Sequence, residues 1–157
     1  ERDIITLPTM PQFRTTCRID GEYTLKVSDC YKHFEDSICA INDFEHRDHL
    51  WEVPYRCLIN KQCKNVITAG RSASGEGYGW DVLRVIPPAI ITGQAAAHAA
   101  CQAIREKTGV ADVNITTLQN SLEKDNVMIH FPDEYVPVDK TVIIHGKNAV
   151  KIDGGHL

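Results

Sequence analysis

Long apolar runs are absent from this 157-residue sequence, since no stretch reaches the roughly 18 apolar residues expected of a membrane-spanning helix. A basic excess is absent as well: 17 Lys and Arg stand against 21 Asp and Glu, which gives a formal net charge of −4. We therefore expect that neither a membrane nor nucleic acid is the partner of this chain. Its 43% hydrophobic and 24% charged residues fit one soluble domain or part of a larger one.

Cysteine pairs of the C-x-x-C type are also absent. The six cysteines are scattered along the chain, and together with the seven histidines they show no spacing typical of a zinc site. From this pattern we expect free thiols, a reducing and therefore cytoplasmic location, and no metal site.

Complete phosphate-binding signatures are missing too. The chain has no G-x-x-x-x-G-K-[ST] motif, and in the run Gly75-x-Gly77-x-Gly79 the third glycine of G-x-G-x-x-G is replaced by Trp80. Taken alone, these glycines indicate a flexible turn.

What the chain does have is a strand–loop–helix unit. Val66 to Ala69 predicts a strand buried on both faces, as in a parallel sheet, and Gly70 to Gly79 predicts a glycine-rich loop. Residues 87–107 predict an alanine-rich helix that opens with two prolines and is capped by Gly109. The start of such a helix favours an anionic cofactor. Because the helix lacks a charged face, we expect it to pack closely against a sheet or a cofactor.

Residues 1–60 are expected to be mostly β. After the long helix, the sequence predicts a second helix that Thr116 or Thr117 caps and that ends near Lys124. Residues 13–17 and 23–27 are expected to be extended and to be joined by a turn at Asp20-Gly21. Residues 51–55 and 127–131 are expected to be two further extended segments. In the tail, residues 141–145 and 149–152 are expected to form a hairpin.

Arg84 precedes the long helix and lies among apolar residues. A lone arginine is usually solvated, but the neighbours Val85 and Ile86 favour a guanidinium held against a phosphate or a carboxylate.

Five sequence blocks occur in the same order as the conserved blocks of a known family. They are MPQFRTTCRIDGEYTL, DSI, WEVPYRCLI, NVITAGRSAS and LRVIPPAIITGQAAAHAA. Between about Pro11 and Phe131 they resemble the C-terminal part of the glutathione-reductase-like FAD-dependent oxidoreductases. Members of that family carry R-x-x-R-R-I-x-G-x-Y, I-P-Y-R-x-L, N-L-x-x-A-G-R and R-V-x-P…G-Q-A-A-G-x-A-A blocks.

The resemblance implies an α/β fold, of which this chain would be the C-terminal part and, taken alone, an α+β fragment. Residues 1–60 would end a substrate or cap region, 61–131 would belong to the FAD-binding domain, and 132–157 would form a tail with a hairpin. The family's N-terminal dinucleotide-binding region does not occur in the sequence, so it would be a partner, and without it we expect self-association.

The resemblance also implies FAD as the cofactor and a small molecule as the substrate. No catalytic residue is implied, because the segment Gly75 to Trp80 departs from the family pattern. The alternative function is a non-enzymatic domain that binds an anionic ligand or a protein partner. The residues that the resemblance places near FAD are Gly70, Arg71, Arg84, Val85, Pro87, Gly93 and Gln94.

Overall fold

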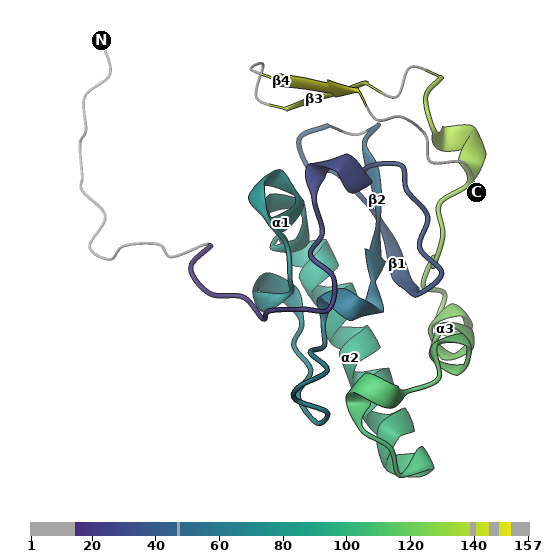
Figure 1. Cartoon of the computed structure of the whole chain (residues 1–157). Helices are drawn as coiled ribbons and strands as arrows, with labels where there is room; N and C mark the ends of the chain where they lie inside the picture. Colours follow the sequence, from purple (N-terminus) through teal and green to yellow (C-terminus); the bar gives the residue numbers. More distant parts are fainter. Residues whose placement is uncertain (1–14, 47, 139–140, 145–147, 152–157) are drawn as a thin grey trace, which may run out of the picture.

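The computed structural model describes residues 15–46, 48–138, 141–144 and 148–151, which form helices and two small antiparallel sheets (Figure 1). This mixed content agrees with the expected α/β or α+β class. The strands are β1 (Ser37–Asn42), β2 (Leu50–Pro54), β3 (Thr141–Ile144) and β4 (Asn148–Lys151). The α-helices are α1 (Gly77–Leu83), α2 (Ile86–Glu106) and α3 (Ile115–Lys124), and short 3-10 helices are η1 (Val27–Asp29), η2 (Tyr55–Cys57), η3 (Gly70–Ser72), η4 (Val110–Asp112) and η5 (Asp133–Tyr135).

The β1–β2 sheet forms the centre of the molecule. Its register pairs Cys39 with Val53 and Ile41 with Trp51, and a bulge lies between Ser37 and Cys39. Trp51 and Val53 are completely buried. Strand β2 confirms the predicted extended segment over residues 51–54, whereas residue 55 begins η2. The sequence did not predict β1, because its residues are buried almost continuously and give no apolar–polar alternation.

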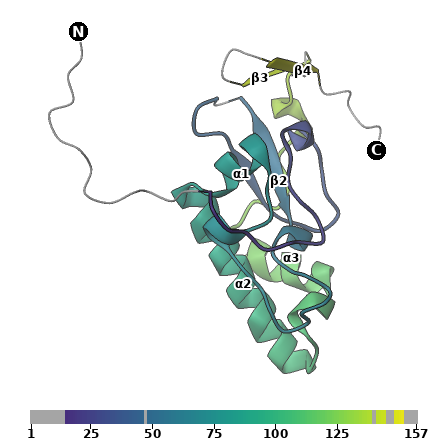
Figure 2. The ribbon, with the colours of Figure 1, turned by 60° about the vertical axis from the view of Figure 1, so that its left-hand side comes forward.

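Helix α2 runs along one face of this sheet, with α3 beside it (Figures 1 and 2). Its buried residues Thr92, Ala95, Ala99 and Ala103 are three or four positions apart and therefore share one face. Their small side chains allow the helix to approach β1 closely. The prediction of close packing against a sheet is confirmed.

The predicted caps of the two helices need correction. Helix α2 ends at Glu106, and its C-cap is Lys107, which adopts the left-handed conformation at φ 56°, whereas Gly109 does not. Gly109 is needed for a different reason, since a Cβ there would lie 2.7 Å from the carbonyl oxygen of Lys64. The cap of α3 is Asn114, whose side chain accepts the N–H of Thr117, so neither Thr116 nor Thr117 is the cap.

The buried strand expected at Val66 to Ala69 is wrong. Only Ile67 makes a β-bridge, with Ile59, and the Thr68 N–H donates to the Leu58 carbonyl oxygen; the residues before Leu58 form η2 and offer no strand to continue the pairing. Val66 is 51% exposed. The prediction of a glycine-rich loop from Gly70 to Gly79 is also wrong in part. Residues 70–72 form the 3-10 helix η3, and α1 begins at Gly77.

The hairpin expected at Asp20-Gly21 is also wrong. The N–H groups of Glu22 and Tyr23 bond to the carbonyl oxygens of Ile59 and Arg56 instead, so this segment lies along η2 and the residues after it. Leu25 makes a parallel bridge with Gly75.

The remaining extended segments have mixed outcomes. The hairpin in the tail is confirmed, with Val142 opposite Val150 in the β3–β4 pair, although residues 145 and 152 of that prediction lie outside the described residues. Residues 15–17 form no strand, and 13 and 14 lie outside the described residues. Residues 127–131 form no assigned strand, yet the Ala40 N–H of β1 donates to the Met128 carbonyl oxygen. In the part of the chain that the structure describes, no helix is both long and apolar enough to cross a membrane.

Two helical glycines allow a matched test of the packing. A Cβ at Gly79 would lie 2.5 Å from the Leu25 carbonyl oxygen, so Gly79→Ala should lower the free energy of unfolding by about 1–3 kcal/mol through overpacking. A Cβ at Gly93 would meet nothing within 4 Å, so Gly93→Ala should raise the free energy of unfolding by about 0.5–1 kcal/mol. Urea titration of both variants measures the two signs, and a stabilised Gly79→Ala variant would contradict this packing.

Candidate functional site

The start of α2 is the first candidate site. Val85 is the N-cap, without a capping side-chain hydrogen bond, and Ile86, Pro87 and Pro88 make up the first turn. The prolines have no N–H, and the Ala89 N–H already bonds to the Val85 carbonyl oxygen at 3.0 Å. Ile86 therefore carries the single N–H group of that turn. Ile86 and Pro87 are exposed, so the positive end of the helix dipole faces the surface.

The 3-10 turn η3 is attached to this end of α2. Gly70 has a φ of +63°, and a Cβ there would lie only 3.2 Å from the Cβ of Ala89. Its N–H donates to the Thr92 Oγ1 at 2.8 Å, and that hydroxyl donates to the Pro88 carbonyl oxygen at 2.7 Å. Glycine is therefore required at position 70, both for its backbone conformation and for its close approach to α2.

Two arginines lie near the same end. The Arg84 Nε donates to the Asp81 Oδ1 at 2.7 Å, and the Arg84 side chain is 20% exposed. This ion pair orients the Arg84 guanidinium one residue before the N-cap of α2, with a carboxylate of the chain itself as its partner. Arg71 is exposed, and its carbonyl oxygen accepts the Trp80 Nε1–H at 2.8 Å.

Gly93 and Gln94 lie two turns further along α2. Gly93 belongs to an open side of the helix, whereas the Gln94 Nε2 donates to the Asp125 Oδ2 at the end of α3, 3.1 Å away. His98 Nε2 lies 2.9 Å from the same Asp125 oxygen. The structure therefore gathers Gly70, Arg84, Val85 and Pro87 at the start of α2, but it directs Gln94 toward α3.

A second feature of α2 is its outer face. Ile86, Ile90 and Ile104 are 75%, 65% and 77% exposed, and Gly93, Ala97 and Cys101 lie between them at helical spacing. We call these six residues the outer stripe of α2. They lie away from the buried alanine face and present a continuous apolar surface.

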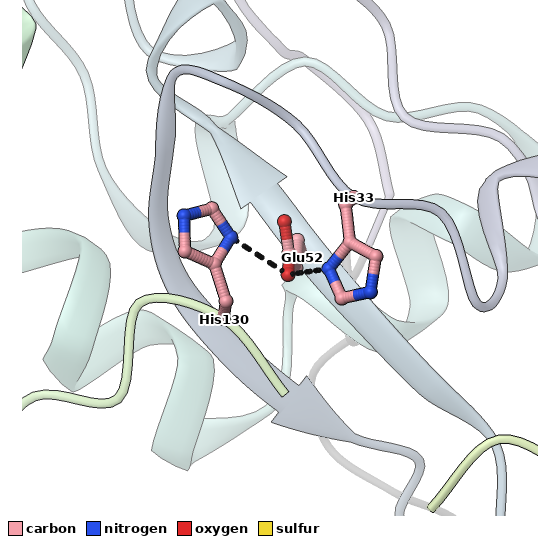
Figure 3. A group of neighbouring side chains, drawn as sticks. All are labelled: His33, Glu52 and His130. Carbon is pink, nitrogen blue, oxygen red and sulfur yellow. Dashed lines mark hydrogen bonds and ion pairs between the residues drawn. The ribbon is translucent and has the colours of Figure 1, made fainter. Parts of the chain in front are cut away.

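A separate polar cluster, which the sequence analysis missed, lies at the β1–β2 sheet (Figure 3). Glu52 of β2 is completely buried, and its Oε1 lies 2.5 Å from the Nδ1 of His33 and 3.0 Å from the Nδ1 of His130. Its Oε2 accepts the Phe34 N–H at 2.7 Å. His33 precedes β1 and His130 follows α3, so no spacing rule could have joined them. The one available signal was a carboxylate in an apolar strand, which requires a partner when buried.

The surroundings of His33 favour a positive charge. Its Nε2 lies 3.0 Å from the Asp133 Oδ1. Burial lowers the pKa of His33, but the hydrogen bonds to Glu52 and Asp133 and the charges of the two carboxylates outweigh burial and raise that pKa above its ordinary value.

Comparison with known proteins identifies the family of the chain. A family model described as FAD dependent oxidoreductase matches residues 1–122, a range that includes η3 and all of α2. No curated protein and no solved structure matches the chain. His130 and Asp133 lie beyond the matched range.

The bond between Gly70 and Thr92 makes a specific prediction. Thr92→Val keeps the side-chain shape but leaves the buried Gly70 N–H without its acceptor, so the free energy of unfolding should fall by about 1–3 kcal/mol. Thr116→Val, at an exposed position of α3, should change it by less than about 0.5 kcal/mol. Urea denaturation of both variants measures the difference. Equal stability of the two variants would show that η3 is not held through Thr92.

Proposed function

The chain belongs to the FAD dependent oxidoreductase family, and from this premise we propose that it provides the flavin-facing part of an FAD site in a glutathione-reductase-like oxidoreductase. The observation that carries the proposal is the junction of η3 with the start of α2. There a glycine with positive φ, an exposed helix start and a fixed arginine come together within the matched range.

The residues at this junction fit an FAD molecule. A flavin is flat and carries negative charge at its pyrimidine edge when reduced, and FAD supplies the electron-transfer chemistry when bound. The Ile86 N–H and the dipole of α2 would stabilise that charge, and Arg84 would add a positive charge held by Asp81. Gly70 and Arg71 of η3, which Gly70 holds close against Ala89 of α2, would line the cofactor beside the start of that helix.

The outer stripe of α2 supports a proposed partner. An apolar surface of this kind normally packs against another protein surface. We propose that the family's dinucleotide-binding region covers the outer stripe and completes the FAD site, and that Gly93 provides room for its close approach. The substrate is proposed to be a small molecule that the flavin oxidises or reduces. The six free cysteines support a reducing, cytoplasmic compartment.

Substitution of Arg84 tests the proposed position of the flavin at the start of α2. In the FAD-loaded protein that contains this chain, Arg84→Ala should weaken FAD binding or make the flavin harder to reduce, by about 1–3 kcal/mol for one lost charged hydrogen bond. Lys124→Ala, at the exposed end of α3, should change neither quantity. The measurements are the FAD dissociation constant and the flavin midpoint potential. If Arg84→Ala equals the parent in both, the flavin does not lie at the start of α2.

The exposed outer stripe leads to a prediction of the oligomeric state and the FAD affinity of the 157-residue chain alone. We expect it to self-associate through the stripe and to bind FAD weakly, because the proposed partner region is absent from the sample. Ile90→Glu places a charge in the stripe and should shift the chain toward a monomer in light scattering, whereas Lys124→Glu should not. A parent chain that is already monomeric, or that binds FAD with micromolar affinity in calorimetry, would contradict this proposal.

A further inference from the structure

We propose that His33, Glu52 and His130 bind a divalent transition-metal ion of the zinc type. This site lies at the β1–β2 sheet and does not depend on the proposed FAD function. The spacing of cysteines and histidines gave no reason to expect a metal, because the three ligands come from segments that only the fold brings together.

The geometry of the three ligand atoms fits one small ion. The Nδ1 atoms of both histidines face the Oε1 of Glu52, and all three atoms lie within 4.8 Å of one another (Figure 3). Ligands bonded to a tetrahedral zinc ion at about 2.0–2.2 Å lie roughly 3.3 Å apart. The distances from Oε1 to the two nitrogens, 2.5 and 3.0 Å, need only small side-chain shifts to reach that value.

The buried charge of Glu52 also suits a cation at this point, either a protonated His33 or a metal ion. Glu52 is completely buried, and a buried carboxylate must be compensated by a positive charge. If His33 donates its Nε2 proton to Asp133, the Nδ1 lone pair faces the Glu52 oxygen. A metal ion among the three atoms would then bind both histidine nitrogens and the carboxylate together, in place of two N–H donors to the same Glu52 oxygen.

The atoms around the cluster resemble the outer partners of known metal ligands. Metal-binding histidines commonly donate their second N–H to a carboxylate, as His33 Nε2 does to Asp133. The Phe34 N–H holds the second oxygen of Glu52, and the ring of Phe131 packs against that of His33 at a centroid distance of 4.4 Å. These contacts fix the orientation of two of the three ligands before any ion binds.

The ligand set indicates the class of ion. Two imidazoles and one carboxylate suit zinc and other first-row transition metals, whereas magnesium and calcium prefer oxygen ligands alone. Three protein ligands leave a fourth position for water or another small ligand. The His130 side chain is 48% exposed, so the ion has one side near the surface.

The experiment is a titration of the metal-free, tag-free chain with Zn²⁺, followed by calorimetry, and with Co²⁺, followed by visible absorption. We expect one equivalent of either ion per chain and a Co²⁺ spectrum of nitrogen and oxygen ligands. His130→Ala should abolish this binding, and Asp133→Asn should weaken it by roughly 10–100-fold as an outer partner. Zn²⁺ should also raise the melting temperature of the parent but not of His130→Ala.

The matched control is His98→Ala, which removes a histidine that contacts Ser121 and Asp125 and is not one of the three proposed ligands. Its metal affinity should equal that of the parent. Three results would overturn the proposal: no stoichiometric binding, equal binding by His130→Ala and the parent, or an intense near-ultraviolet band from thiolate ligands to Co²⁺. The Asp133 side chain is 81% exposed, so Asp133→Asn keeps the test decisive even if a ligand variant does not fold. Because the assay contains no FAD, its outcome is separate from that of the flavin proposal.

Discussion

The close contact between α2 and the β1–β2 sheet is the constraint on which the rest of the structure depends. Ala95, Ala99 and Ala103 are buried on the sheet side of α2, and their side chains end at Cβ, so the helix can lie directly against β1. Thr92 continues the same face and binds the N–H of Gly70, which places η3 against the second turn of the helix. The position of the candidate flavin site therefore follows from the packing of small residues.

The two faces of α2 have different roles in this account. The inner face packs against the sheet, whereas the outer stripe from Ile86 to Ile104 is apolar and exposed. A helix that is apolar on both sides is normally buried between two layers of structure. This is the reason for the proposal that the dinucleotide-binding region covers the outer stripe. The polar cluster around Glu52 stabilises the opposite part of the molecule, where the segment after α3 meets the sheet.

Local signals predicted the parts of the fold that depend on local interactions. Both long helices, β2 and the β3–β4 hairpin were predicted because periodicity, prolines and turn residues determine them. Val66 to Ala69 was mistaken for a strand because its apolar run says nothing about whether a partner strand is within reach. Similarly, His33 and His130 are joined only by the fold, through contacts between distant segments. The motif resemblance identified the FAD-dependent oxidoreductase family, which the match over residues 1–122 confirms at that level, because it combines many positions at once.

The central claim is that η3 and the start of α2 form the flavin-facing part of an FAD site. The most direct measurement is amide hydrogen exchange of the protein containing this chain, followed with and without FAD by mass spectrometry. When FAD is present, amide exchange should be slower in peptides that cover Gly70 to Ser72 and Arg84 to Ile90. Peptides from α3 that cover Thr116 to Leu122 should be unchanged. Protection by FAD elsewhere in the chain, with none at η3 or the start of α2, would contradict the claim.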